Sequence, residues 1–206
     1  MTNDCHVLIV STIADVATDD VVRHLNSRNV RADRINTEDY PFSRTLTFLP
    51  SNERGTPGLS LDGRLIAAPT SIWYRRLRTP PKPCEMDEGI YDFCLQENRA
   101  AFTGSIMGFN ARWMSHPGAV WQAEYKPYQL RLASDLGLPF PRTIITNDPA
   151  AIRAAFREFG SMIVKPAKTG HVVRDGKEYS IFTSRVLKEH LEELESARLS
   201  LLFIKS

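Results

Sequence analysis

The region that most constrains the fold lies between residues 124 and 166, where helical and β-strand patterns alternate. Apolar residues recur at the spacing of one helix face from Leu130 to Leu136, and Gly137 follows them as a stop signal. The next segment, residues 142–146 (RTIIT), is rich in β-branched residues and predicts a strand. This order of elements predicts a compact unit of mixed α/β structure.

The second half of this region repeats the same order of helix and strand. Asn147 or Asp148 can cap a second helix, Pro149 suits its first turn, and Gly160 can end it. The apolar segment MIVK then predicts a second strand that ends at Lys165.

Two lysines frame this region, because Lys126 opens its first helix and Lys165 closes its last strand, just before Pro166. A lysine at the end of a buried strand is a well-placed point charge. Two such cations around one α/β unit indicate a polyphosphate held between them. The alternative is that both are ordinary surface lysines.

The whole pattern of lysine, Gln-Leu, Gly-Leu-Pro-x-Pro-x-Thr, a proline-started helix, glycine and Ile-Val-Lys-Pro resembles the ATP-grasp superfamily. The resemblance is closest to the peptide-modifying ligases of the microviridin (graspetide) type, and ribosomal-protein glutamate ligases come second. It implies ATP and magnesium as cofactors, a precursor peptide as partner, and contacts from Lys126 and Lys165 to the nucleotide phosphates.

Composition sets broad limits on function. The formal net charge of +2 is too small to indicate binding to nucleic acid or to an anionic membrane. The three cysteines, at positions 5, 84 and 94, lack the spacing of a metal site and favour a cytoplasmic compartment. No signal peptide is apparent, and no segment is apolar over the length that a bilayer requires.

The N-terminal region begins with the pattern of a parallel strand pair. Residues 6–11 predict a buried strand, a helix is expected from about Asp19 with Thr18 as its cap, and residues 30–36 predict a second strand. No glycine-rich turn lies between Ser11 and Asp19, which argues against a dinucleotide site.

Four further strands are expected before residue 80: one at 44–49, one on each side of the hairpin signal Asp62-Gly63, and one at 71–77. One of Arg75 and Arg76 is expected to share a face with Trp73 and could hold an acidic side chain or a phosphate in bidentate geometry. The alternative is that both arginines pair with surface carboxylates. The microviridin-type ligases carry a similar W-Y-R-R strand, from which no catalytic role follows.

Residues 87–109 predict one long helix. Its expected buried stripe consists of Ile90, Phe93, Cys94, Ala101, Phe102 and Ile106. His116 lies in a predicted corner and is expected to be structural. We place a domain boundary near residue 120, between an N-terminal pre-ATP-grasp α/β domain (1–120) and an incomplete central (lid) α+β subdomain (121–206).

The segment after Lys165 predicts a hairpin around Asp175-Gly176, a strand at 178–186, a helix at 186–197 and a last strand at 199–206. The resemblance implies a lid over the triphosphate, and a hairpin associated with docking the leader of a precursor peptide. Lys168 and His171 could touch phosphate, although solvated loop positions are the simpler interpretation.

The resemblance covers two of three family domains, because the part that would bind magnesium and the acyl-phosphate is not in these residues. The main hypothesis is an ATP-dependent carboxylate–amine or carboxylate–hydroxyl ligase, in fragment or truncated form, which forms ester or amide cross-links through an acyl-phosphate. We expect little turnover from this chain alone. The alternatives are a non-catalytic peptide-binding or scaffold module, and an unrelated two-domain α/β protein; a homodimer stays open.

Overall fold

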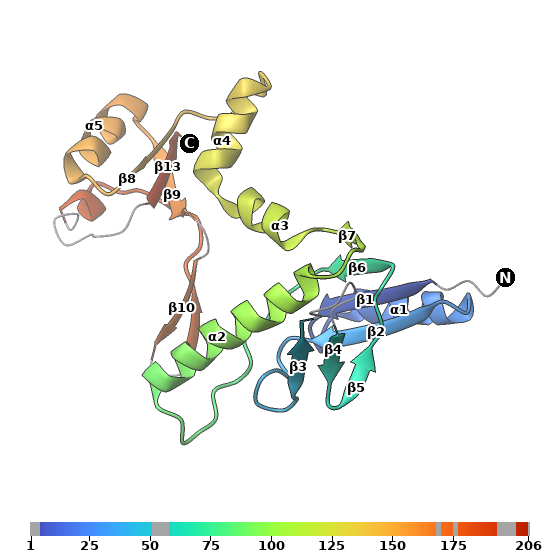
Figure 1. Ribbon diagram of the computed structural model, residues 1–206. Coiled ribbons are helices and arrows are strands. Elements are labelled where there is room, and N and C mark those ends of the chain that lie inside the picture. The colour runs from blue at the N-terminus through green and yellow to red at the C-terminus, as the bar shows by residue number, and fades with distance from the viewer. Residues whose placement is uncertain (1–4, 51–57, 168–169, 175–176, 193–200, 206) are drawn as a thin grey trace. The chain divides into compact units, whose positions relative to one another are not determined.

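A computed structural model describes residues 5–50, 58–167, 170–174, 177–192 and 201–205 (Figure 1). The chain divides into two compact units, Met1–Ala119 and Val120–Ser206, called the N-terminal and C-terminal units below. The mixed α/β fold class expected from the sequence is confirmed.

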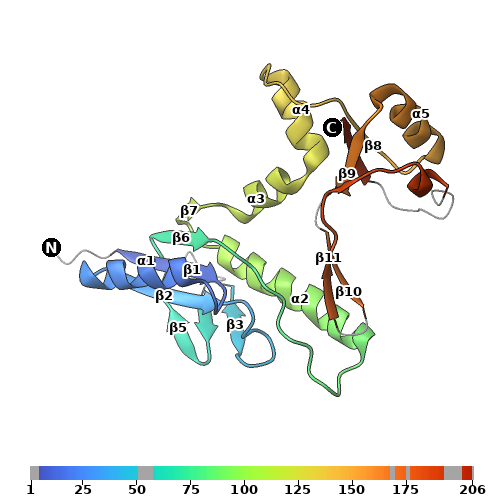
Figure 2. The same cartoon turned by 180° about the vertical axis from the view of Figure 1, so that it is seen from behind.

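The N-terminal unit is built on a parallel four-stranded sheet in the order β2-β1-β6-β7. Its strands are β1 (His6–Ser11), β2 (Arg31–Asn36), β6 (Ser71–Tyr74) and β7 (Arg112–Met114). Leu8, Ile9 and Val10 of β1 are fully buried, as a central parallel strand requires when both faces are covered. Helices α1 (Val16–Ser27) and α2 (Glu88–Met107) cover opposite faces of this sheet, as Figures 1 and 2 show.

The start of α1 differs from the prediction. The helix begins at Val16 with Asp15 in the cap position, and Thr18 lies inside the helix rather than before it. The reason is tertiary, because the Thr18 side chain is fully buried and its hydroxyl lies 3.0 Å from that of Ser11. The predicted parallel pairing of β1 with β2 is confirmed.

A small antiparallel sheet of β3 (Leu46–Leu49), β4 (Gly58–Leu61) and β5 (Arg64–Ile66) follows β2 in sequence. The turn between β4 and β5 lies at Asp62 and Gly63, which both have positive φ, at 50° and 75°. This is the backbone that an Asp-Gly hairpin turn needs, and the prediction there is confirmed.

The buried face of α2 was partly wrong in the prediction. Phe102 and Ile106 are buried, but Ile90 is 56% exposed and Phe93 is 65% exposed. Tyr91 and Leu95 are buried in their place, together with Thr103 and Ser105. The Tyr91 hydroxyl donates to the Pro80 carbonyl at 2.6 Å, and its ring stacks on Phe42. These contacts choose the face, because apolar residues occur on both sides of this helix.

The C-terminal unit holds an antiparallel sheet in the order β12-β9-β13-β8. Its strands are β8 (Thr143–Thr146), β9 (Met162–Pro166), β12 (Ser184–Arg185) and β13 (Leu201–Lys205). Helix α5 (Pro149–Phe159) packs on one face through a core of Ile152, Ala155, Met162 and Val186. Asp148 caps α5 by accepting from the backbone N–H of Ala150, as expected.

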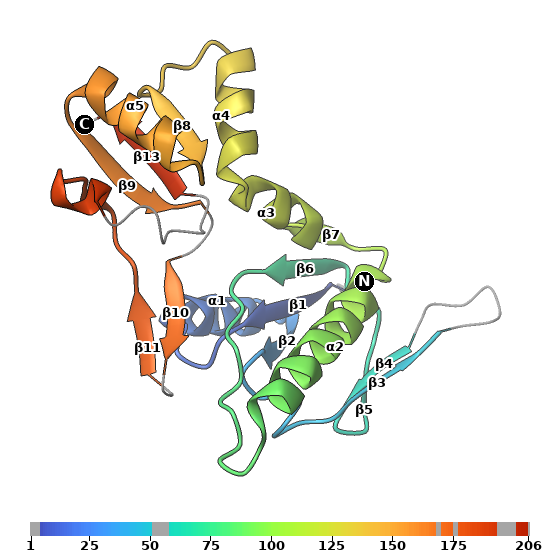
Figure 3. The same ribbon diagram turned by 90° about the vertical axis from the view of Figure 1, so that its left-hand side faces the viewer.

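Two helices precede this sheet, α3 (Pro117–Glu124) and α4 (Lys126–Asp135). Strands β10 (His171–Arg174) and β11 (Lys177–Ser180) form a separate antiparallel ribbon, visible in Figure 3. The Asp175-Gly176 turn lies outside the described residues. The predicted strand at 178–186 is split into β11 and β12, and the helix expected from 186 is described only as a 3₁₀ turn, Glu189–Leu191.

Candidate functional site

The face of the C-terminal sheet that α5 leaves uncovered carries Lys165. Met162 and Val164 belong to the core beneath α5, so Ile163 and Lys165 point to the opposite face, because neighbours along a strand alternate. In the register, Leu202 lies opposite both Lys165 and Ile145. Lys165 and Ile145 therefore share one face of the sheet.

This second face carries both apolar and cationic side chains, because Arg185 lies opposite Ile163 in the register and so shares the face of Lys165. Ile163 and Ile145 are half-buried there, and so is Lys165. A partly buried lysine beside flat aliphatic surface can neutralise one end of a ligand while its ring system lies on the apolar part. The arrangement suits a molecule with a flat ring at one end and phosphate at the other.

Lys126 reaches the end of the same strand. It is the first residue of α4, and its Nζ donates to the carbonyl oxygen of Ala167 at 3.0 Å. Ala167 lies two residues beyond Lys165, so the structure brings a group on α4 to the end of β9. The two lysines thus belong to one neighbourhood of the C-terminal unit.

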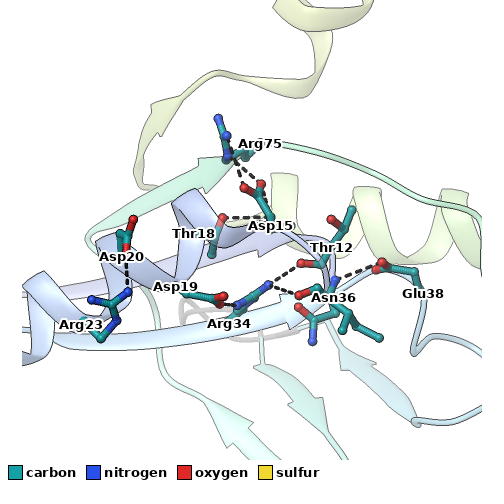
Figure 4. Close-up of polar contacts among 12 residues, drawn as sticks. Thr12, Asp15, Thr18, Asp19, Asp20, Arg23, Arg34, Asn36, Glu38 and Arg75 are labelled. Atoms are coloured by element: carbon teal, nitrogen blue, oxygen red, sulfur yellow. Dashed lines mark hydrogen bonds and ion pairs between the residues drawn. The ribbon is translucent and has the colours of Figure 1, made fainter.

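Arg75, in the N-terminal unit, forms a bidentate ion pair with Asp15 (Figure 4). Its Nε lies 2.7 Å from Oδ2 and its Nη2 lies 3.3 Å from Oδ1. The guanidinium also lies over the ring of Trp73, 5.0 Å from the ring centroid. The expected sharing of a face with Trp73 is correct, and the acidic partner is a carboxylate inside the protein.

The Asp15 carboxylate lies in a polar cluster at the carboxyl end of β1. It accepts from the Ser11 hydroxyl at 2.9 Å, and its side chain is 4% exposed. The Arg75 hydrogen bond is the main reason that the pKa of Asp15 falls to about 2, against the opposing effect of burial. Asp15 is therefore charged at neutral pH and holds Arg75 in place. Arg76 is exposed and forms no ion pair within the described residues.

Side chains also hold the loop between β1 and α1, which lacks glycine. Arg34 binds the carbonyls of Thr12 and Ile13 and the carboxylate of Asp19, while Glu38 accepts from the Ile13 N–H at 3.0 Å (Figure 4). Sequence reasoning missed Arg34 and Glu38. The position of Arg34 within an otherwise half-buried strand, β2, was the available signal.

The remaining candidates have simpler roles or lie outside the described residues. His116 accepts from the Gly118 N–H through Nδ1 at 3.1 Å and packs on Trp113, which is a local structural contact. Lys168 is not among the described residues, and only the backbone of His171 is described. No group of three or more His, Cys, Asp or Glu side chains in the described chain could hold a metal ion. Within the same residues, no helix combines the length and apolar character that crossing a membrane requires.

A family model described as the MvdD pre-ATP-grasp domain matches residues 6–120. A search of curated proteins found no match by sequence. Among solved structures, the macrocyclase MdnC of Microcystis aeruginosa MRC, bound with precursor peptide MdnA, is 26% identical with a TM-score of 0.86. The match covers 97% of this chain and 68% of that one.

Two other solved structures resemble the chain over most of its length. The macrocyclase MdnB of the same organism is 29% identical with a TM-score of 0.77, and the match covers 98% of this chain and 68% of that one. An ATP-grasp ligase of Chryseobacterium gregarium, in complex with ADP and a leader and core peptide, is 23% identical with a TM-score of 0.81. That match covers 98% of this chain but 62% of the other, and at this identity it supports the fold alone.

Proposed function

Because this chain belongs to the MvdD pre-ATP-grasp family, matched over residues 6–120, we propose that it serves an ATP-dependent ligase that modifies a ribosomally made peptide. The observation that carries the proposal is the pair of lysines in the C-terminal unit, Lys165 on the uncovered face of β9 and Lys126 at the end of the same strand. The chain spans 62% to 68% of the solved ligases described above.

The reaction would run in two balanced steps. A carboxylate oxygen of the peptide attacks the γ-phosphorus of ATP and displaces ADP, which leaves an acyl-phosphate. An amine or a hydroxyl then attacks the acyl carbon, loses its proton and displaces inorganic phosphate. The product is an amide or an ester between two side chains of the peptide.

In this proposal, Lys165 and Lys126 bind and neutralise the phosphates of the nucleotide. Phosphoryl transfer gains most of its rate from positioning and from electrostatic stabilisation of the phosphate oxygens. Lys165 supplies a charge from a strand, whose backbone holds it more firmly than a loop would. The apolar face formed by Ile163 and Ile145 supplies a surface for the base.

ATP fits the residues of this face, whereas magnesium does not fit any described cluster. Bound magnesium would neutralise charge between the phosphates, and it prefers one or two carboxylates with water. Since no described group of acidic residues could hold it, we assign no residue to the metal and derive no step through it.

The experiment is a calorimetric titration of the 206-residue chain with ATP, and separately with a precursor peptide encoded near its gene. We expect ATP binding that Lys165→Ala weakens by about 10-fold or more, which is the usual value of a charge-assisted hydrogen bond. Lys188→Ala is the control, because Lys188 is an exposed lysine of the same unit. Equal ATP affinity in both variants would overturn the proposal.

The same titration separates the alternative function, a peptide-binding or scaffold module without catalysis. That alternative predicts affinity for the peptide and no measurable affinity for ATP. The ligase proposal is supported if the chain binds both ATP and the peptide, and if only Lys165→Ala and Lys126→Ala reduce the affinity for ATP.

A further inference from the structure

A pocket lies at the carboxyl edge of the parallel sheet in the N-terminal unit. Its walls include Ile35, near the end of β2, and Thr37, just beyond it, together with Leu77 and Arg78, a few residues beyond the end of β6. The space between the walls measures about 450 Å³, a value that includes the solvent at its open mouth.

The position of this pocket follows from the strand order. The chain passes from β1 to β2 on one side and then crosses back to β6 on the other side of β1. Strand connections that leave in opposite directions create a crevice outside the carboxyl ends of the strands, which is where open α/β sheets bind ligands. Asp15 and Arg75 form an ion pair at the carboxyl end of β1, and the pocket lies at the same edge, beside the ends of β2 and β6.

The two chain segments that leave β2 and β6 are tied to each other. The Thr37 hydroxyl donates to the Arg78 carbonyl at 3.1 Å and accepts from the Arg78 N–H at 2.8 Å. This reciprocal pair of hydrogen bonds fixes the backbone that carries Leu77 and Arg78, so the entrance to the pocket is formed before any ligand arrives.

The inner walls are mainly apolar and come from α2 and from the loop after β2. Leu95 and Phe102 of α2 are 8% and 6% exposed, and Tyr40 packs its ring 6.1 Å from that of Phe102. The Tyr40 hydroxyl donates to Asn98 Oδ1 at 2.7 Å, so these two polar groups of the wall are paired with each other. An interior of this kind takes an apolar side chain without leaving a buried polar group unpaired.

The mouth of the pocket is positively charged. Arg78 and Arg99 are both exposed and line the pocket, and Arg99 Nη2 donates to Thr79 Oγ1 at 2.6 Å. Within the described part of the chain, neither forms an ion pair. Six other arginines of this unit, at positions 23, 31, 34, 44, 64 and 75, each pair with an aspartate.

We propose that this pocket binds a bulky apolar side chain of a peptide, while Arg78 and Arg99 hold carboxylates of neighbouring residues in that peptide. The proposal rests on the proposed function in one respect, because it takes the ligand to be a peptide. It adds that the N-terminal unit selects an apolar residue in an acidic context, by charge complementarity at the mouth and by burial inside.

The test uses fluorescence anisotropy with the intact chain and three labelled synthetic peptides. The first carries one leucine flanked by glutamates, the second has alanine in place of leucine, and the third has glutamines in place of the glutamates. We expect the first peptide to bind, and the second to bind about 10-fold more weakly because a buried leucine is lost. The affinity of the third peptide should no longer depend on salt concentration, because its charges are absent.

Matched variants locate the site. Arg78→Gln and Arg99→Gln each remove one rim charge and should weaken the leucine–glutamate peptide about 10-fold. Arg28→Gln removes the same charge from an exposed arginine at the end of α1 and should leave the affinity unchanged. Circular dichroism checks that all three variants fold, and backbone NMR shifts should move at Thr37, Leu77 and Phe102.

The outcomes separate this proposal from the ligase itself. Equal peptide affinity in Arg28→Gln, Arg78→Gln and Arg99→Gln, or equal binding of the glutamate and glutamine peptides, would overturn the pocket proposal. If ATP affinity is absent while these peptide results hold, the pocket stands and the ligase proposal falls. If ATP binding depends on Lys165 while the peptide results fail, the pocket proposal alone is lost.

Discussion

Lys126 donates a hydrogen bond from Nζ to the carbonyl oxygen of Ala167, 3.0 Å away and two residues beyond Lys165. The contact joins the first residue of a helix to the end of a strand far along the chain. Lys126 is thereby joined to the end of the strand that carries Lys165, although a helix–strand–helix–strand segment separates the two lysines in sequence. It also means that Lys126 has a structural contact of its own.

The first prediction concerns that double role. Lys126→Ala should weaken ATP binding and also reduce thermal stability, because the contact to Ala167 is lost together with the charge. Lys165→Ala should weaken ATP binding with little change in stability. Calorimetric titration and differential scanning calorimetry of both variants check this, and the reverse ranking of the two melting temperatures would contradict it.

The second prediction concerns acid stability and the pair of Asp15 with Arg75. Arg75 lowers the pKa of Asp15 to about 2, below the value of ~3.9 for an unfolded aspartate. The stabilisation is therefore complete above about pH 4 and is lost as the pH falls through about 2. Arg75→Ala removes the largest cause, so the pKa should rise and the acid unfolding midpoint should move to higher pH.

Circular dichroism across an acid titration measures that midpoint. Arg76→Ala is the matched control, because Arg76 is the exposed neighbour and forms no ion pair in the described structure. An unchanged midpoint in Arg75→Ala would show that Asp15 does not depend on Arg75 for its low pKa.

The third prediction compares two glycines with open space around the position of a Cβ atom. Gly160 ends α5 with φ of +72°, whereas Gly104 lies inside α2, and a Cβ at either would meet nothing within 4 Å. Gly160→Ala should destabilise by about 1–2 kcal/mol because an L-residue is strained there. Gly104→Ala should stabilise by about 0.5–1 kcal/mol through helix propensity.

Urea unfolding of the two variants gives both free energies. Because the new methyl group meets no neighbour at either site, only the backbone conformation affects the unfolding free energy. We therefore expect changes of opposite sign in the two variants. Equal effects of the two substitutions would show that Gly160 does not need its left-handed conformation.

The fourth prediction concerns the core of the C-terminal unit. Met162 is fully buried against α5, and Met162→Ala should cost about 2–5 kcal/mol of unfolding free energy. Leu136→Ala, at a residue that is 64% exposed, should cost less than about 0.5 kcal/mol. Chemical denaturation followed by far-ultraviolet circular dichroism measures both, and a small effect at Met162 would contradict the packing.

Several elements were predictable because their signals are local. Backbone preferences of a few residues predict the Asp62-Gly63 turn and the Asp148 cap with Pro149. The same kind of signal predicts the end of α5 at Gly160 and the strand that carries Lys165. The similarity to the peptide ligases was also readable, because it depends on the same short motifs in a fixed order. The roles of Lys126 and Lys165 toward ATP, the division near residue 120 and a homodimer stay predictions.

Other features were not readable, because they depend on partners that lie far away in the sequence. Helix α2 has apolar side chains on more than one side, and only the contacts of Tyr91 with Pro80 and Phe42 choose which side is buried. The observed start of α1 differs from the prediction for the same reason, since the Thr18 hydroxyl lies within hydrogen-bonding distance of the Ser11 hydroxyl inside the protein. The wall of the pocket likewise joins Thr37 to Arg78, which lies 41 residues further along the chain.

The sequence by itself determined the succession of helices and strands, the turns between them and the placement of a lysine at a strand end, because dihedral preferences and periodicity act within a few residues. Only the tertiary structure decided that Arg75 is held by Asp15, that Lys126 contacts the end of β9, and that Arg78 and Arg99 line the mouth of an apolar pocket. Ion pairing and burial depend on which residues are close in space. The separation of two residues along the sequence does not determine that distance, which is fixed only when the sheets form.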